Sequence, residues 1–134
     1  MRRTDDRNEK SFPRGVPSET NLSIETGRPD DGVVEVRISG ELGTATAPLL
    51  DAVLASAQAQ RPARIDVDVA EAWFADPAGL LVLIMARRRL GNAGARLAVH
   101  GPPGLLRRAF AATGLNRVFA VDELAADAAA SSPH

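Results

Sequence analysis

Two neighbouring segments of the chain alternate strictly between apolar and polar side chains. Residues 22–26 (LSIET) and residues 34–38 (VEVRI) share this period of two, and the turn-rich residues 27–32 (GRPDDG) separate them. A period of two is typical of a strand with one buried face, and glycine and proline between such segments favour a turn. The two segments are therefore predicted to form an antiparallel hairpin.

The spacing of apolar residues becomes helical after residue 40. Leucine, valine and alanine recur at helical intervals over residues 49–57, with Thr46 as a candidate cap, so a helix is predicted up to residue 60. Residues 63–69 (ARIDVDV) alternate again and predict a central strand. The next apolar run predicts a second helix, with Asp76 as its N-cap and Pro77 at its first helical position.

Three elements and a terminal helix are expected after the second helix. Residues 96–100 predict a short strand, and a third helix follows the two prolines at 102–103 and stops at the Thr-Gly pair 113–114. Residues 118–121 predict a final strand that leads into the terminal helix. The order ββαβαβαβα indicates an α/β fold with a mixed β-sheet and helices packed on it.

The ends of this 134-residue chain differ in composition from its middle. Residues 1–21 mix both signs of charge with few apolar side chains, so a disordered tail is expected there. Residues 22–127 are expected to form the folded domain, and residues 128–134 to fray. No apolar stretch follows the basic start as a secretory signal would require, so the expected location is cytoplasmic.

The overall composition argues against several classes of partner and site. A net charge of −1 provides no field that would hold nucleic acid or an anionic membrane. The longest apolar run, residues 77–86, is too short for a membrane-spanning helix, which needs about 18 residues. The absence of cysteine and the presence of only two histidines predict no metal site, and no cofactor is expected.

No motif of an established catalytic machinery occurs, and the protein is predicted not to be an enzyme. His100 has no neighbouring serine or cysteine to activate, so it is interpreted as a structural or surface residue. Asp66 and Asp68 lie on one face of the predicted central strand. They are interpreted either as the polar face of that strand or as paired carboxylates near a cleft. Asp76 lies where α/β folds place their sites, whereas its alternative role as a helix cap requires no function.

The second predicted helix carries two unusual runs. Residues 80–85 are apolar on every side, whereas a helix on a sheet needs only one apolar stripe. Part of this run is therefore expected either to form an exposed protein-binding patch or to be buried between neighbouring elements. The arginines at 87–89 fan around the helix and are interpreted as a solvated helix end rather than a nucleic-acid contact.

Five short motifs follow one another in order along residues 22–127: SGEL at 39–42, ATAP at 45–48, FADPAGL at 74–80, GP at 101–102 and TGL at 113–115. In this order the chain resembles the STAS domain of bacterial anti-sigma factor antagonists. The resemblance implies a non-enzymatic binding protein of a partner-switching system that regulates transcription through a sigma factor. Its partner would be an anti-sigma factor that is also a serine kinase, and the protein itself would be a monomer or weak dimer.

The resemblance also implies a partner-binding surface made by the loop before the first helix and the start of the second. Asp76 would fix the helix start, Gly79 would admit the partner's backbone and Leu80 would add apolar contact. The residues expected to take part are Glu41, Thr44, Thr46, Asp76, Pro77, Ala78, Gly79 and Leu80.

The chain departs from the family at the position of the phosphorylated serine, which is Pro77 here and has no hydroxyl. Thr44 and Thr46 are the alternative acceptors near this position. Either the protein is a permanently unphosphorylated antagonist or it is a divergent domain that serves another partner. The alternative function is that of a STAS scaffold subunit in a larger signalling or membrane-transport assembly.

Overall fold

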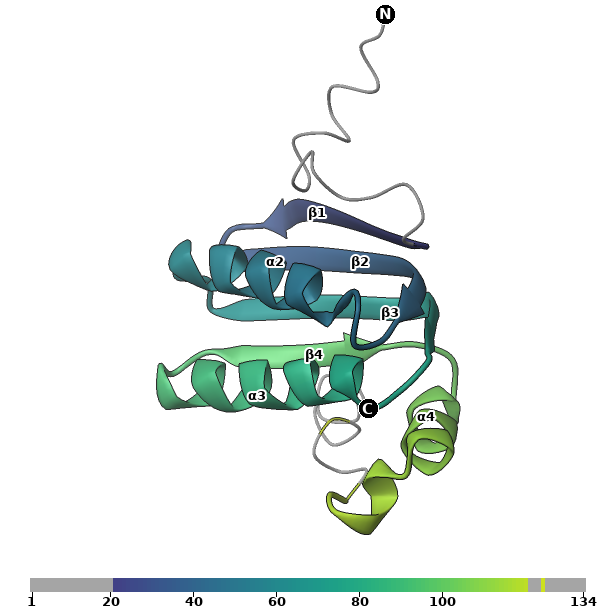
Figure 1. Ribbon diagram of the computed structural model, residues 1–134. Coiled ribbons are helices and arrows are strands. Elements are labelled where there is room, and N and C mark those ends of the chain that lie inside the picture. The colour runs from purple at the N-terminus through teal and green to yellow at the C-terminus, as the bar shows by residue number, and fades with distance from the viewer. Residues whose placement is uncertain (1–20, 121–123, 125–134) are drawn as a thin grey trace, which may run out of the picture.

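The strands of the sheet follow their order along the chain. The structure, a computed structural model, describes residues 21–120 and residue 124. Over these residues the sheet consists of β1 (Leu22–Asp30), β2 (Val33–Leu42), β3 (Arg64–Phe74) and β4 (Arg96–His100), in that spatial order (Figure 1). β1 and β2 form the predicted antiparallel hairpin, whereas β2, β3 and β4 are parallel. The predicted mixed α/β sheet is confirmed.

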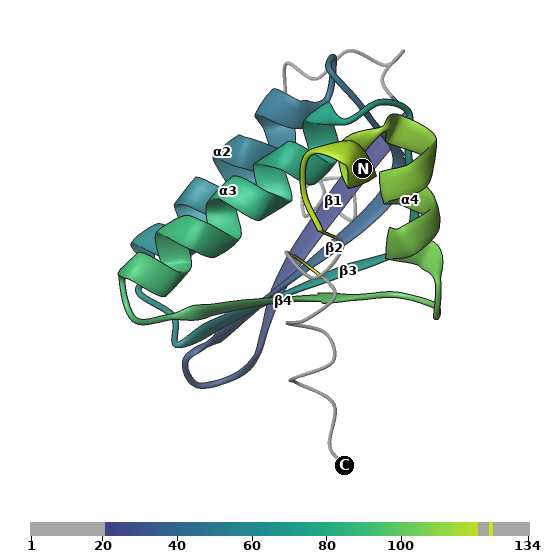
Figure 2. The ribbon, with the colours of Figure 1, turned by 90° about the horizontal axis from the view of Figure 1, so that it is seen from below.

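Two long helices cover one face of this sheet. α2 (Ala47–Ala59) connects β2 to β3 and α3 (Ala78–Asn92) connects β3 to β4, and Figure 2 shows both on the same side. Alternate side chains of the strands point toward these helices. Val36, Val67 and Val99 are in register across three strands and are at most 1% exposed, so the core lies between the sheet and the two helices.

A shorter helical unit lies beyond one end of the sheet (Figure 2). α4 (Leu105–Thr113) and the single-turn 3-10 helix η1 (Leu115–Arg117) follow β4. Gly104 before α4 and Gly114 after it both have φ +82°, a conformation that glycine adopts without strain. Phe110 of α4 is fully buried, and this residue joins the unit to the core.

The prediction of a strand over residues 118–121 is wrong for residues 118–120, which are the part of it that the structure describes. Residues 118–120 form a turn and irregular chain, and Val118 is 72% exposed. The amides of Val118 and Phe119 both donate to the carbonyl of Leu115, at 2.9 and 2.8 Å. These amides are therefore committed to a local turn and are not available to a sheet ladder. Residue 121 and most of the predicted terminal helix lie outside the described residues, as do residues 1–20 of the tail predicted over 1–21 and the tail predicted over 128–134.

β3 extends further than the predicted strand of residues 63–69. It continues to Phe74, and its pairing with β2 shifts register once, between Arg37 and Ser39. Beyond the shift Leu42 pairs with Phe74, so the ends of β2 and β3 lie at the same edge of the sheet. This extension positions the loop after β2 next to the start of α3.

Candidate functional site

The predicted site forms where β2 and β3 end together. The amide of Ala75 donates to the carbonyl of Leu42 at 2.7 Å, which keeps the two chain segments side by side beyond the last strand pair. The loop at 43–46 therefore lies against the turn at 75–77, although the two are about thirty residues apart in sequence. Both α2 and α3 begin here, so the sheet edge positions two helix starts at once.

The carboxylate of Asp76 joins these two segments. Its Oδ2 accepts hydrogen bonds from the amide of Thr44 at 2.9 Å and from the Thr44 hydroxyl at 3.1 Å. Its Oδ1 accepts a hydrogen bond from the amide of Ala78 at 2.9 Å. The helix begins at Ala78, one residue later than predicted, yet Asp76 still reaches the first-turn amide that a capping aspartate serves.

These hydrogen bonds also set the charge of the site. The amides of Thr44 and Ala78 lower the pKa of Asp76 below its ordinary value of 3.8, because they stabilise the ionised carboxylate. The site therefore carries a full negative charge at neutral pH, held at the junction of the loop and the helix.

Thr46 supports the loop from inside rather than capping α2. Its side chain is buried, with 4% exposure, and makes no cap hydrogen bond to the helix. The hydroxyl accepts a hydrogen bond from the amide of Gly43 at 3.0 Å and donates to the carbonyl of Glu41 at 3.0 Å. The predicted capping role is corrected, because this hydroxyl is already satisfied within the loop. Burial also keeps it out of direct contact with a partner.

Gly79 and Leu80 face the core instead of a partner. A Cβ added at Gly79 would lie 2.9 Å from the Cβ of Leu42 in β2, so this glycine is needed for close packing of α3 on the sheet. Leu80 is fully buried. The expectations that Gly79 admits a partner's backbone and that Leu80 offers apolar contact are corrected by this burial, since both residues shape the site from beneath.

The accessible part of the site continues along α3. Thr44 is exposed, and Glu41, Pro77 and Ala78 are partly exposed. One outward stripe of the helix follows, because residues three or four apart share a face. We call the following set the α3 surface: Glu41, Thr44, Pro77, Ala78, Leu81, Val82 and Met85, of which Met85 is 49% exposed.

The apolar run at 80–85 is partly buried and partly exposed. Leu80, Leu83 and Ile84 are fully buried in the core. Leu81 and Val82 are partly exposed, and Met85 is exposed. The run serves the core on one side of α3 and the α3 surface on the other.

The other acidic candidates lie away from this site, on the sheet face opposite α2 and α3. Asp66 accepts two hydrogen bonds from the guanidinium of Arg64, at 2.9 and 3.1 Å, and lies 3.3 Å from Nε2 of His100. Asp68 accepts a hydrogen bond from the amide of Ala70 at 2.9 Å. Both carboxylates therefore belong to the polar face of β3, as the simpler interpretation had it.

The arginines at 87–89 belong to the surface of α3. The guanidinium of Arg88 lies 5.4 Å from the ring centroid of Phe119, which is a cation–π distance. Nε of Arg89 donates to Oε1 of Gln58 at 3.3 Å, and one of its terminal nitrogens is 3.9 Å from Asp51 on α2. These contacts join α3 to α2 and to the segment after η1.

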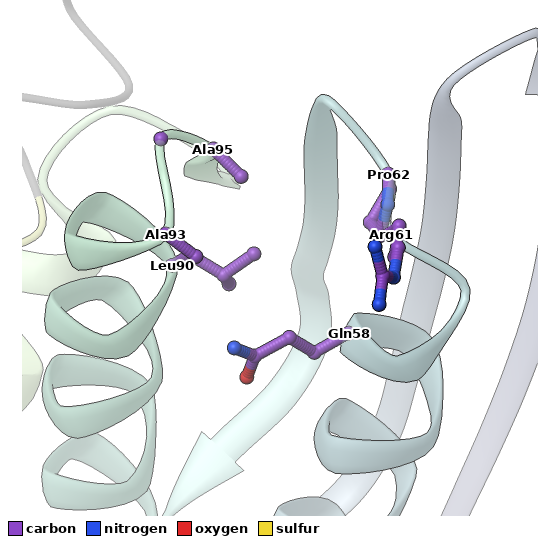
Figure 3. A pocket seen from close by; sticks show the side chains of 7 residues that line it. Gln58, Arg61, Pro62, Leu90, Ala93 and Ala95 are labelled. Carbon is purple, nitrogen blue, oxygen red and sulfur yellow. The ribbon is translucent and has the colours of Figure 1, made fainter.

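A cavity of about 370 Å³ lies at the other end of the two helices (Figure 3). The ends of α2 and α3 and the loops that lead from them to β3 and β4 form its wall, and Gln58 and Leu90 point into it from the two helices. Its lining residues are Gln58, Arg61, Pro62, Leu90, Ala93, Gly94 and Ala95. This lining contains no carboxylate or histidine side chain, and the cavity is separate from the α3 surface.

Residues 21–120 hold no group of three histidine, aspartate or glutamate side chains arranged to bind a metal ion. None of the helices formed by these residues is both long and apolar enough to cross a bilayer.

Sequence reasoning missed one exposed aromatic residue beside the site. Trp73 is 56% exposed and pairs with Glu41 across β2 and β3. The signal was present, because this is the single tryptophan of the chain and it stands three residues before Asp76. The strand had been predicted to end at residue 69, so the side on which residue 73 lies was not predicted.

Comparison with known proteins gives a consistent result. The family model described as "Mlab, STAS domain" matches residues 27–124. The anti-sigma-B factor antagonist of Staphylococcus epidermidis is 31% identical over 103 residues, which cover 77% of this chain and 94% of that protein. The anti-sigma-B factor antagonist of Listeria monocytogenes is 28% identical over 101 residues, covering 75% and 89%.

Solved structures agree in fold. An anti-sigma factor antagonist from Mycobacterium paratuberculosis superposes with a TM-score of 0.60 at 24% identity, covering 84% of this chain and 98% of that one. The anti-sigma factor antagonist SpoIIAA in its unphosphorylated form gives a TM-score of 0.56 at 19% identity, covering 72% and 97%.

Proposed function

The chain belongs to the STAS domain family, and from this premise we propose that it is an anti-sigma factor antagonist that works by binding. Its partner is a serine kinase-like anti-sigma factor of the cytoplasm, and the contact is made by the α3 surface. The relatives in Staphylococcus epidermidis and Listeria monocytogenes are both named as anti-sigma-B factor antagonists, which supports this choice of partner class.

The observation that carries the proposal is the hydrogen-bonded junction at Asp76. One carboxylate holds the amide and hydroxyl of Thr44 on one side and the amide of Ala78 on the other. A loop and a helix start are thereby fixed as one surface before any partner arrives. Preorganisation of this kind lowers the entropy lost on binding and favours a recognition role.

The state of the remaining polar groups supports binding rather than catalysis. Asp66 is paired with Arg64 and His100, and Asp68 with a backbone amide. Neither carboxylate lies at the α3 surface or lines the cavity at Gln58. A nucleophile beside a base, which acid–base or covalent catalysis requires, is not assembled by these groups.

We further propose that binding is not switched by phosphate at the start of α3, where Pro77 has no acceptor oxygen. Of the two nearby threonines, Thr46 is buried and Thr44 is exposed. The protein then acts as a permanently binding-competent antagonist, whose effect depends on its abundance. Phosphate on Thr44 would place a dianion next to the carboxylate of Asp76 and separate the loop from the helix.

The test is a pull-down from lysate of the source organism, with mass spectrometry of the captured proteins and of the bait. Wild-type protein is compared with Ala78→Arg, which places a long cation on the α3 surface, and with Ala59→Arg at the exposed far end of α2. We expect wild type and Ala59→Arg to capture one kinase-like anti-sigma factor, Ala78→Arg to lose it, and the bait to carry no phosphate.

Three results would each contradict a part of this proposal. Equal capture by all three proteins would remove the α3 surface from the contact. Migration of the untagged protein in a large multi-subunit particle would favour the alternative, a scaffold subunit of a larger signalling or membrane-transport assembly. Phosphate on Thr44 would show that the switch has been moved rather than lost.

A further inference from the structure

Trp73 lies on the sheet face that α2 and α3 leave uncovered. Its neighbour Phe74 pairs with Leu42, which is fully buried on the helix side, and successive residues of a strand point to opposite faces. Trp73 accordingly pairs with Glu41 on the open face, and 56% of it is exposed. Trp73 is not a member of the hydrophobic core cluster, and tryptophan is one of the residue types enriched at binding hot spots.

Two carboxylates flank this indole. Glu41 lies across from it on β2, and Glu71 precedes it by two residues on the same face of β3. Among residues 21–120, neither glutamate forms an ion pair, in contrast to Glu25 and Glu35, which both pair with Arg37 on the same face. The end of the open face near the site therefore carries an aromatic side chain next to two carboxylates that form no ion pair within residues 21–120.

The distribution of charge along the chain extends this asymmetry. Residues 22–76 contain ten acidic and four basic residues, whereas residues 77–120 contain seven arginines and no acidic residue. The net charge of −1 conceals this separation. Trp73 lies in the acidic half of the chain, so a basic partner surface would complement its charge, and charge complementarity of this kind steers association and fixes its orientation.

We propose that Trp73, Glu41 and Glu71 form a second contact that receives an arginine or lysine side chain of the anti-sigma factor. The cation lies over the indole face, and the two carboxylates pair with its N–H groups. The contact continues the α3 surface around the sheet edge through Glu41, which belongs to both. The inference rests on the proposed function, because the occupant is the same partner.

A first experiment tests the electrostatics of this contact without the partner. Trp73 is the single tryptophan and the chain has no tyrosine, so indole fluorescence reports on this position alone. We expect caesium to quench the emission more strongly than iodide, relative to free N-acetyltryptophanamide. The double variant Glu41→Gln/Glu71→Gln should lose this preference, and Asp31→Asn, in the turn at the opposite end of β2, should keep it. Equal quenching by the two ions in wild type would overturn the proposal.

A second experiment measures binding to the purified anti-sigma factor that the pull-down identifies. We expect the emission of Trp73 to shift to shorter wavelength on binding, and Trp73→Ala to weaken the affinity about tenfold. Trp73→Phe should retain most of the affinity because a ring remains, and Glu41→Gln/Glu71→Gln should weaken it about threefold at low salt and less at high salt. Val118→Ala, which trims another exposed apolar side chain, serves as the control.

The two proposals fail in different ways. Full affinity of Trp73→Ala together with an unshifted emission would overturn the second contact and leave the antagonist function intact. Absence of any anti-sigma factor binding by wild type would overturn both. Circular dichroism of each variant confirms that it is folded, so that a loss of affinity reports on the contact itself.

Discussion

Replacing Gly79 with alanine tests how the site is supported. The added methyl would lie 2.9 Å from the Cβ of Leu42, which is closer than non-bonded carbon atoms approach one another. It would lie 3.5 Å from the Cγ and Cδ1 of the same residue. The Cβ of Leu42 is fixed to the backbone of β2, so α3 must move away from the sheet. Overpacking of this kind costs about 2 kcal/mol, and the better helix propensity of alanine offsets about 1 kcal/mol.

The expected net loss of about 1 kcal/mol lowers the melting temperature of a domain of this size by about 4–8 °C. The matched control is Gly91→Ala in the same helix, where a new Cβ meets nothing within 4 Å. This variant should gain about 0.5–1 kcal/mol because alanine loses less backbone entropy on folding. Chemical denaturation of both variants measures the difference. A change of the same sign in the free energy of unfolding of both variants would refute the packing role of Gly79. The substitution Gly79→Arg would likewise disturb the packing of α3 on β2, so it would not report on partner contact.

Three further predictions concern the loop, the charge and the core. Thr46→Val should destabilise the protein by about 1–3 kcal/mol, because the amide of Gly43 and the carbonyl of Glu41 lose their buried partner, whereas Thr46→Ser should stay close to wild type in the same denaturation assay. Folding lowers the pKa of Asp76, so its contribution to stability is complete above the ordinary value of 3.8 and is lost as the pH falls through the folded-state pKa. Asp76→Asn should therefore reduce the loss of stability at acid pH, measured as the free energy of unfolding against pH. Phe110→Ala should cost about 3–5 kcal/mol by calorimetry since the ring is fully buried, and a near-neutral result would show that α4 is not anchored by it.

The periodicity of the sequence was sufficient for most of the fold. Segments with an unbroken period, such as 34–38 and 49–57, form the elements predicted from them. The prediction failed where a register shift or a local turn intervenes. The irregular pairing between Arg37 and Ser39 carries β3 five residues past its apparent end, and the turn at Leu115 uses the amides that a last strand would need.

The candidate site also combines features that the sequence could predict with features that it could not. The carboxylate of Asp76 could be predicted because a capping aspartate before a proline acts locally. Its bond to Thr44 could not, since it depends on two strand ends meeting across a large sequence separation. The burial of Gly79 likewise depends on packing between α3 and β2, and that of Thr46 on how the loop around it folds, which one-dimensional patterns do not contain.

The most direct test of the central claim is hydrogen–deuterium exchange of the full chain, free and bound to the captured anti-sigma factor. We predict slowed exchange on binding over residues 41–46 and 76–82, with residues 71–73 protected as well if the second contact forms. The amides at 90–95, which border the cavity, should exchange as in the free protein. Protection confined to the cavity or to α4 and η1, with residues 41–46 and 76–82 unchanged, would contradict the claim that the α3 surface binds the partner.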